Sequence, residues 1–327
     1  MTHNVPFKVI WQHNTDTTKS TDKGAGLELI KDVRLHQGAI VALCTFSSSL
    51  SAKEKEEDQA QTSIYLLSAG EDRRLMLFDL TANDAVGPFH NPLLSKDAEW
   101  AADGPITDMD VSASRHAFAY ASEDKICYVR RLATDPAEMT LVMAFLGHTA
   151  PVTAVRWNEV CGQWVTGSED RSIRTWSADQ PACLQIISIG APVTTIGLDL
   201  LNGCIVVGTS IAELKVIDPH PTGPQSNADI IRKMTGHSEG IHAIVHIPDR
   251  RQYLTASSDG TIKVWTAYLK PTQRRWLHQP SQDALEQHGS MDDLKQKPDT
   301  AAQTTDAHAA KVCLNSCCHR RSFHPFH

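Results

Sequence analysis

Short runs of alternating apolar and polar residues, separated by turn residues, recur along most of the chain. Residues 147–176 and 236–265 show the pattern most clearly, because in each of them such runs are separated by a turn rich in Ser, Asp and Gly. Alternation with a period of two places one side of a run in a core and the other towards solvent, as half-buried β-strands require. Helical spacing is absent. The pattern therefore predicts an all-β protein built from short strands.

The same two segments are copies of one repeat. In both, an Asp follows a Gly-His pair 22 residues after the His, a Thr stands four residues before the Asp, and a Trp stands six residues after it. Two sets at identical offsets indicate a repeated structural unit. The members are His148, Thr166, Asp170 and Trp176 in one copy, and His237, Thr255, Asp259 and Trp265 in the other.

A third copy is interrupted by an insertion. It contains His36, Ser68 and Asp72, and His36 precedes Asp72 by about 14 residues more than the repeat spacing. The extra residues are the charged, serine-rich stretch 48–61, which predicts a solvated loop.

Two further copies are degenerate, and the chain begins within a unit. Arg130 takes the Trp position in one copy, while Ile211 replaces the Asp and Ile217 the Trp in the other. Before the first copy, residues 7–11 and 27–34 predict the third and fourth strands of a preceding unit. No pair of strands is predicted for 281–310 to complete it.

These Gly-His, Asp and Trp signatures resemble the WD40-repeat family. The resemblance implies a β-propeller of four-stranded blades, with five recognisable blades and an N-terminal half-blade. Six blades are expected, with seven as the alternative, in a ring that is irregular or truncated at its start. We expect the propeller to span 1–279, and 280–327 to form a polar, disordered tail.

In this family the His, Thr or Ser, Asp and Trp of a blade form a hydrogen-bonded chain across its strands. A His beside an Asp and a hydroxyl also suggests a hydrolase triad. However, a triad is needed once, whereas these sets recur at one offset per blade. We therefore expect a structural role for the eleven residues of the three sets.

The resemblance also implies that partners dock on one face, at two first-strand positions and one turn position of each blade. The first-strand positions are Ala39, Val41, Pro105, Thr107, Pro151, Thr153, Pro192, Thr194, Gly240 and His242, and the turn positions are Glu71, Glu123, Glu169, Ile211 and Ser258. Three consecutive blades thus carry a Glu. Either these glutamates form an acidic arc that binds a Lys- or Arg-bearing segment, or they are merely solvated turn residues.

The C-terminal end is rich in potential zinc ligands. These are Cys313, Cys317, Cys318, His319, His324 and His327. Their spacing lacks the paired C-x2-C knuckles of zinc fingers and ribbons. The polar composition that precedes them favours disorder, so we predict no metal site.

Composition limits the remaining classes of function. The net charge of −7 and pI near 6.1 disfavour nucleic acid as a partner. No apolar run reaches the length of a membrane span, and the N-terminus lacks the features of a secretory signal, so we expect a cytoplasmic or nuclear protein. Phosphate-binding glycine loops, H-E-x-x-H and nucleophile elbows are missing, so no catalytic residue or cofactor is predicted.

Three functions remain after this reading of the sequence. The first is a non-catalytic scaffold or adaptor that uses one propeller face. The second is a substrate receptor or core subunit of a multiprotein complex, of the ubiquitin ligase or chromatin type. A propeller enzyme is the third, for which the channel mouth offers only the glutamates and His242.

Overall fold

The described part of the chain consists of strands joined by turns and loops, and it contains no helix. In the computed structural model, the described residues are 8–13, 27–33, 36–49, 62–80, 84–86, 100–133, 139–220 and 228–269. They contain 21 strands. No helix long and apolar enough to cross a membrane occurs within these ranges.

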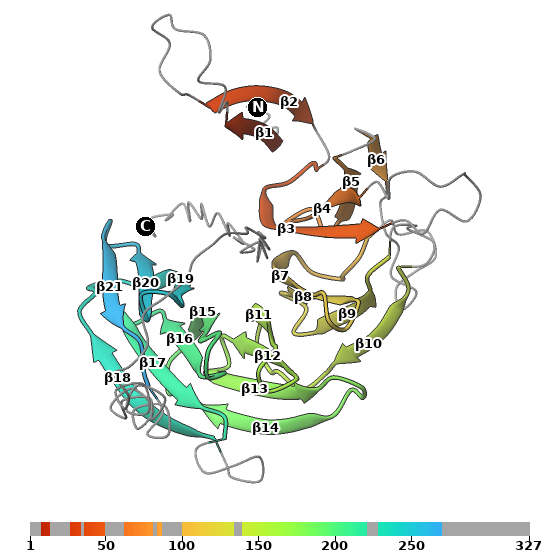
Figure 1. Cartoon of the computed structure of the whole chain (residues 1–327). Helices are drawn as coiled ribbons and strands as arrows, with labels where there is room; N and C mark the ends of the chain where they lie inside the picture. The colour runs from red at the N-terminus through yellow and green to blue at the C-terminus, as the bar shows by residue number, and fades with distance from the viewer. Residues whose placement is uncertain are drawn as a thin grey trace, which may run out of the picture.

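The strands form five consecutive antiparallel sheets that are arranged as the blades of a propeller (Figure 1). Blade 1 comprises β3 (Ile40–Ser49), β4 (Thr62–Gly70), β5 (Leu75–Asp79) and β6 (Asp84–Val86). Blade 2 comprises β7 (Ile106–Ser112), β8 (Ala117–Ser122), β9 (Cys127–Arg131) and β10 (Leu141–Phe145). Blade 3 comprises β11 (Val152–Asn158), β12 (Gln163–Ser168), β13 (Ser172–Ser177) and β14 (Cys183–Ser188). Blade 4 comprises β15 (Val193–Leu198), β16 (Ile205–Thr209), β17 (Glu213–Asp218) and β18 (Asp229–Thr235), and blade 5 comprises β19 (Ile241–Ile247), β20 (Gln252–Ser257) and β21 (Ile262–Thr266).

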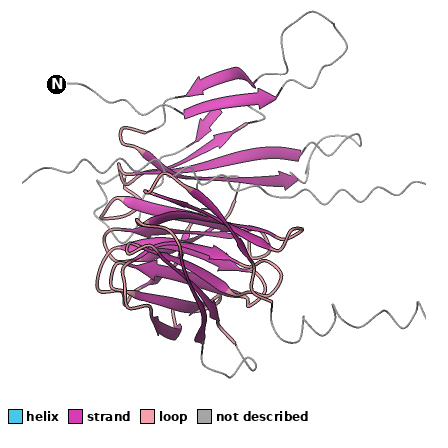
Figure 2. Ribbon diagram, turned by 90° about the vertical axis from the view of Figure 1, so that its left-hand side faces the viewer, coloured by secondary structure: helices cyan, strands magenta, loops and turns pink. Residues whose placement is uncertain are grey.

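A two-stranded antiparallel hairpin precedes blade 1. It consists of β1 (Lys8–His13) and β2 (Leu27–Val33). It lies beyond blade 1 in both views of the chain (Figures 1 and 2). The predicted half-blade and the five predicted blades are therefore confirmed. A sixth or seventh complete blade, the tail 280–327 and most of the insertion lie outside the described residues.

The insertion falls between the first two strands of blade 1. Strands β3 and β4 stay paired as far as Ser49 and Thr62. Ser48 and Ser49, which the sequence analysis included in the loop, therefore belong to β3. Residues 50–61 lie outside the described ranges.

The hydrophobic core lies between neighbouring blades. Four clusters of buried side chains fill the four junctions from blade 1 to blade 5. Packing at these junctions is close: a Cβ added at Gly167 of β12 would lie 2.6 Å from Cγ1 of Val193 in the next blade. At these four junctions neighbouring blades therefore share one core, and no separate core forms within a blade.

A β-bulge occurs in the first strand of every described blade. The bulged residues are Val41, Thr107, Thr153, Thr194 and His242. A bulge leaves one residue out of register and redirects its side chain. Three of these side chains consequently reach the next blade: the hydroxyls of Thr107, Thr153 and Thr194 donate to the carbonyls of Val152, Val193 and Ile241.

Charged groups also join the first strands of blades 2 and 3. The carboxylate of Asp108 accepts from the backbone N of Val155 at 3.0 Å and from the guanidinium of Arg156. Asp110 accepts from the backbone N of Trp157 at 2.8 Å. Burial raises the pKa of both carboxyl groups, although Arg156 opposes the shift.

Blade 5 exposes an apolar face that the other blades bury. Ile262 and Val264 of β21 are 73% and 58% exposed, and Val245 of β19 is 49% exposed. At the equivalent positions of blade 3, Ile173 and Thr175 are completely buried, and Ile173 packs in the cluster shared with blade 4. The described part of blade 5 thus ends in an uncovered sheet.

Candidate interaction surface

Blades 3 and 5 contain the same chain of hydrogen bonds, and blade 1 contains it without the Trp, because Phe78 stands at that position. In blade 3, His148 Nδ1 lies 2.8 Å from Asp170 Oδ2, His148 Nε2 lies 2.8 Å from Thr166 Oγ1, and Trp176 Nε1 donates to that oxygen at 2.8 Å. Blade 5 repeats these contacts at 2.8, 2.7 and 2.8 Å with His237, Asp259, Thr255 and Trp265. In blade 1, His36 lies 2.9 Å from both Asp72 and Ser68.

Chemistry determines the direction of this chain in blade 3. An ionised carboxylate only accepts, so Nδ1 of His148 carries the proton and Nε2 accepts from the Thr166 hydroxyl. The imidazole is therefore neutral, and burial lowers the pKa of His148 even though Asp170 opposes that shift. Burial raises the pKa of Asp170, but hydrogen bonds from Ser172 and His148 outweigh it and lower the pKa to about 2.

Blade 2 fills the same space with a different polar set. Tyr128 replaces the His as donor to Asp124, at 2.7 Å. Arg130, at the Trp position, donates from Nε to the hydroxyl of Tyr120 at 3.2 Å, and Tyr120 donates to the carbonyl of Ala101 at 2.8 Å. The rings of Tyr120 and Tyr128 stack with centroids 5.2 Å apart.

Blade 4 replaces the polar set with hydrocarbon. Ile189, Val207 and Ile217 stand at the His, Thr and Trp positions and belong to one buried cluster. Removing every member of a polar network leaves no group unsatisfied, so such a replacement costs little. The equivalent positions of the five blades are therefore filled by three different sets of side chains: the His-Asp set, the Tyr-Arg set and an apolar set.

One end of the propeller brings the predicted turn and first-strand positions together. We call it the turn end, and it comprises the turns after the second strands together with the residues that precede the first strands. In blade 3 the backbone N of Glu169 donates to the carbonyl of Pro151 at 3.0 Å. The same bond joins Glu71 to Ala39, Glu123 to Pro105, Ser210 to Pro192 and Ser258 to Gly240.

These bonds correct one assignment. Ile211 is the predicted turn residue of blade 4, but Ser210 makes the bond that defines the position. Ile211 instead stands where the other blades have Asp. The repeat spacing itself aligns Ile211 with that Asp, so the turn position, which directly precedes the Asp, belongs to Ser210.

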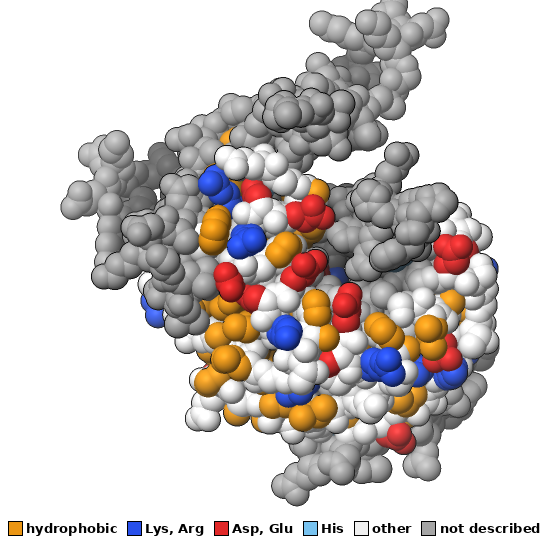
Figure 3. Space-filling view, turned by 180° about the vertical axis from the view of Figure 1, so that it is seen from behind, with side chains coloured by type: hydrophobic (Ala, Val, Ile, Leu, Met, Phe, Trp, Pro, Cys, Tyr) orange, Lys and Arg blue, Asp and Glu red, His pale blue; other side chains and the backbone are white. Residues whose placement is uncertain are grey.

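The turn end is not purely acidic. Glu71 and Glu123 are exposed and Glu169 is half-buried. Two residues after each Glu, a basic residue adopts the left-handed conformation: Arg73 has φ 65°, Lys125 has φ 73° and Arg171 has φ 67°. Seen from behind, the described surface of the chain as a whole also mixes acidic, basic and hydrophobic side chains (Figure 3).

The remaining predicted binding residues differ in how available they are. Thr107, Thr153 and Thr194 are half-buried, and their hydroxyls donate to the adjacent blade. His242 occupies the corresponding bulge of blade 5, and its ring bonds to the hydroxyl of Ser258 within the same blade. Glu71, Glu123 and Ser258 are the most accessible of the eight.

Trp100 is a residue of the turn end that the sequence analysis missed. It is 40% exposed and lies under the guanidinium of Arg73, 4.8 Å from its ring centroid. The next residue, Ala101, donates from its backbone N to the carbonyl of Arg73 at 2.8 Å, which anchors the segment. Trp100 belongs to no repeat position, so the only signal in the sequence was an isolated Trp in a polar segment.

The question of a zinc site concerns residues outside the described ranges. All six Cys and His residues near the C-terminus, from Cys313 to His327, lie there. Within the ranges that are described, no group of three or more His, Cys, Asp or Glu side chains is arranged to hold a metal ion.

Comparison with known proteins identifies the repeat. The family model described as WD domain, G-beta repeat matches residues 139–177 and 228–266. These segments contain the two complete hydrogen-bonded sets of blades 3 and 5. Blades 3 and 5 are thus WD40 repeats, and the described part of the chain has a WD40-type β-propeller fold.

Several characterised proteins are similar to parts of the chain. The ribosome biogenesis protein YTM1 of Meyerozyma guilliermondii is 31% identical over 122 residues, which cover 36% of this chain and 26% of that protein. Pre-mRNA-processing factor 17 of Saccharomyces cerevisiae is 23% identical over 122 residues, covering 37% and 26%. The serine-threonine kinase receptor-associated protein of Gallus gallus is 25% identical over 225 residues, covering 68% and 57%. The chain thus spans about a quarter of the length of the first two relatives.

Proposed function

We propose that this chain is a non-catalytic interaction scaffold that binds partner proteins through the turn end of its propeller. The observation that carries the proposal is the recurrence of one backbone bond, from turn to first strand, in all five described blades. It supports a single surface on which Glu71, Glu123, Glu169 and Ser258 stand at equivalent positions, with His242 bonded to Ser258. A rigid surface of this kind suits protein recognition because little ordering is needed on binding.

A structural role for the His and Asp residues supports the non-catalytic part of the proposal. The side chains of His36, His148 and His237 are 0% exposed, so a substrate has no access to the rings. Blade 4 fills the same site with apolar side chains. A catalytic His is needed once and must be accessible to the substrate, whereas these residues are repeated and buried.

Mixed charge and one aromatic residue define the partner chemistry that we expect. The three glutamates favour a segment that bears Lys or Arg, while Arg73, Lys125 and Arg171 require acidic groups between them. Trp100 adds the aromatic contact that interaction hot spots usually contain. We therefore propose a partner segment of alternating charge that packs against Trp100.

Affinity capture with the full chain tests the proposal. The triple variant Glu71→Lys, Glu123→Lys, Glu169→Lys should retain fewer of the wild-type partners, by about tenfold, which corresponds to about 1.4 kcal/mol. The matched control is Asp229→Lys with Asp249→Lys, two exposed aspartates at the opposite end of the propeller. The proposal is wrong if the triple variant stays folded and captures the same partners as wild type.

A second form of the function is a core subunit or substrate receptor of a larger assembly. Relatives named for ribosome biogenesis and for pre-mRNA processing favour it, and of the two expected compartments they favour the nucleus. The apolar face of blade 5 also favours it, since exposed apolar sheet faces mark interaction sites. Size-exclusion chromatography of native extracts separates the two forms, because a core subunit migrates with one stable assembly.

A further inference from the structure

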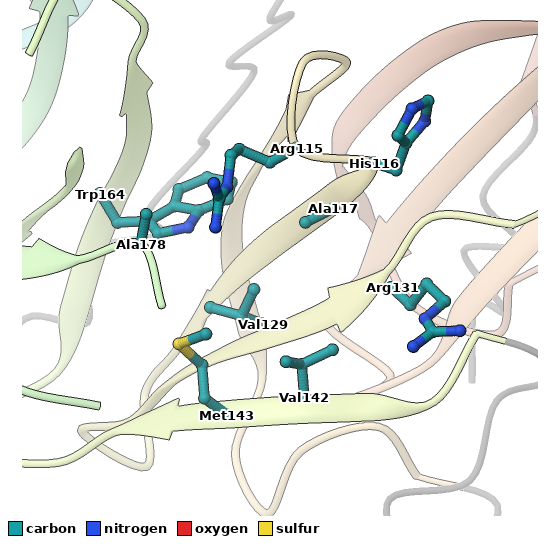
Figure 4. Close-up of a pocket in the computed structure, with 9 residues that line it drawn as sticks. All are labelled: Arg115, His116, Ala117, Val129, Arg131, Val142, Met143, Trp164 and Ala178. Atoms are coloured by element: carbon teal, nitrogen blue, oxygen red, sulfur yellow. The ribbon is translucent and has the colours of Figure 1, made fainter. Parts of the chain in front are cut away.

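A pocket of about 190 Å³ lies between blades 2 and 3, at the end of the propeller opposite the turn end. Blade 2 contributes the β7–β8 turn with Arg115 and His116, the end of β9 with Arg131, and Val142 and Met143 of β10 (Figure 4). Blade 3 contributes Trp164 at the start of β12. The pocket is therefore separate from the surface considered under the proposed function.

The rim of the pocket is basic. Arg115 pairs with Asp179 of blade 3, which holds its guanidinium at the mouth. No described residue forms a hydrogen bond or ion pair with the side chain of His116 or Arg131, and both residues are exposed. The carboxylate of Glu159, in the turn between β11 and β12, contacts the β7–β8 turn at Ser114, from which it accepts at 2.9 Å, and it also accepts from Trp157 Nε1 at 2.6 Å.

Backbone bonds support this rim. The carbonyl of His116 accepts from the backbone N of Leu132 at 2.7 Å, and the backbone N of Arg131 donates to Thr140 at 3.0 Å. These bonds join the β7–β8 turn, β9 and the start of β10. The two basic side chains are thus presented from a braced backbone, which reduces the entropy lost on binding.

The wall beside the basic rim is apolar. Trp164 is completely buried and packs on Trp157, with ring centroids 5.0 Å apart. Met143 lines the same wall, and Val142, 53% exposed, extends it along β10. β10 is also the outer strand of its sheet. The pocket therefore places an apolar seat next to positive charge on a chain whose net charge is −7.

We propose that this interblade pocket binds an acidic segment of a partner protein in which apolar and carboxylate side chains alternate. Arg131, whose side chain lies beside Val142 (Figure 4), holds a carboxylate of the segment, since a guanidinium fork matches the two carboxylate oxygens. The adjoining apolar side chain of the segment packs on Val142 and Met143, above the buried Trp164. The proposal does not depend on the turn end, so each surface can fail without the other.

Fluorescence anisotropy with defined peptides tests it on the full chain. The probe is a labelled eight-residue peptide that alternates Asp and Leu, compared with peptides that alternate Lys and Leu or Asp and Ser. We expect saturable binding of the Asp-Leu peptide only. Arg131→Glu should weaken binding of the Asp-Leu peptide at least about tenfold. Val142→Asp should weaken it as much, and because Val142 is 53% exposed the variant should remain folded.

Arg250→Glu is the matched control. Arg250 is an exposed arginine at the same end of the propeller, in the turn between β19 and β20. We expect its affinity for the peptide to match wild type. The proposal is overturned by no saturation up to about 1 mM peptide, by equal binding of the Lys-Leu peptide, or by an Arg131→Glu variant that binds as wild type. It is also overturned if Arg250→Glu weakens binding as much as Arg131→Glu.

Discussion

The hydroxyl of Thr153 on β11 donates a hydrogen bond to the carbonyl of Val193 on β15, at 2.8 Å. This bond crosses from one blade to the next, and Thr107 and Thr194 make the equivalent bond at the neighbouring junctions. The β-bulge that each first strand contains directs the hydroxyl out of its own sheet. A position that the sequence assigned to partner binding thus joins blades in three cases.

Thr153→Val is expected to destabilise the fold. Valine keeps the shape but leaves the Val193 carbonyl without this donor, so the free energy of unfolding should fall by about 0.5–1.5 kcal/mol. Urea denaturation measures the change. Thr235→Val is the control, because Thr235 is exposed on β18 and its substitution should change stability by less than about 0.5 kcal/mol. Equal effects of the two substitutions would contradict a role for the interblade bond.

Asp170→Ala is expected to cost about 1–3 kcal/mol, because it leaves the buried His148 Nδ1–H without an acceptor. The folded protein holds the pKa of Asp170 at about 2, below its ordinary value of 3.8. A lowered carboxyl pKa stabilises the fold above the unfolded pKa, and this contribution disappears as pH falls through the folded value. The difference between wild type and variant should therefore be constant from pH 5 to 7 and narrow below about pH 4. Thermal melts at each pH check this result.

His148 predicts a second pH effect at milder acidity. Burial lowers its pKa below the ordinary 6.5, so the unfolded chain binds a proton more readily than the fold does. The neutral ring makes its full contribution to stability above pH 6.5, and this contribution declines as the pH falls below that value. The variant His148→Gln should show a flatter stability profile between pH 7 and 5, with a residual slope from His246, whose pKa burial also lowers. A variant with the wild-type slope would refute this assignment.

The fold class was accessible from sequence because the repeat encodes it locally. The alternating runs fall on strands β11 to β13 and β19 to β21, and the residues at fixed offsets from His148 and His237 meet through hydrogen bonds. Even the half-blade was predicted, because residues 7–11 alternate like other third strands. A short-range sequence pattern is enough to predict a strand and its pairing wherever the strand is short and pairs with the next strand in the chain.

Features that depend on contacts between blades were not accessible. Sequence spacing does not reveal that the bulge turns Thr153 towards Val193, since the bulge shows only in the pairing register. The spacing does place Arg130 at the Trp position of blade 2, but it does not reveal that Arg130 bonds to Tyr120 or that Tyr128 replaces the His as donor to Asp124. The basic interblade pocket was not predictable for the same reason, because Arg115 and Arg131 come from blade 2 and Trp164 comes from blade 3.

Ile173→Ala and Ile262→Ala form a matched pair across the repeat. Both residues follow the Asp by three positions, but Ile173 is 0% exposed and Ile262 is 73% exposed. Removing the buried side chain should cost about 2–5 kcal/mol because it leaves a cavity between blades 3 and 4. Ile262→Ala should cost less than about 0.5 kcal/mol in the isolated chain. Chemical denaturation measures both, and a large cost at Ile262 would mean that blade 5 is covered in solution.

The left-handed turn residues allow a reciprocal exchange. Arg171 has φ 67°, whereas blade 5 has Gly260 with φ 74° at the equivalent position. A side chain strains this conformation and glycine does not. Arg171→Gly should therefore raise the free energy of unfolding by about 0.5–1 kcal/mol, and Gly260→Arg should lower it by about as much. Arg250→Gly, at a turn residue without positive φ, is the control and should destabilise slightly.

The same exchange also tests the proposed function. Strained residues persist where another requirement outweighs their cost, and three basic residues in this conformation lie at the turn end. If they contact the partner, Arg171→Gly should combine a higher melting temperature with weaker capture of the partners that wild type retains. A variant that is more stable and binds equally well would show that the basic side chain has no part in recognition, which would leave the glutamates and Trp100 as the contacts to examine.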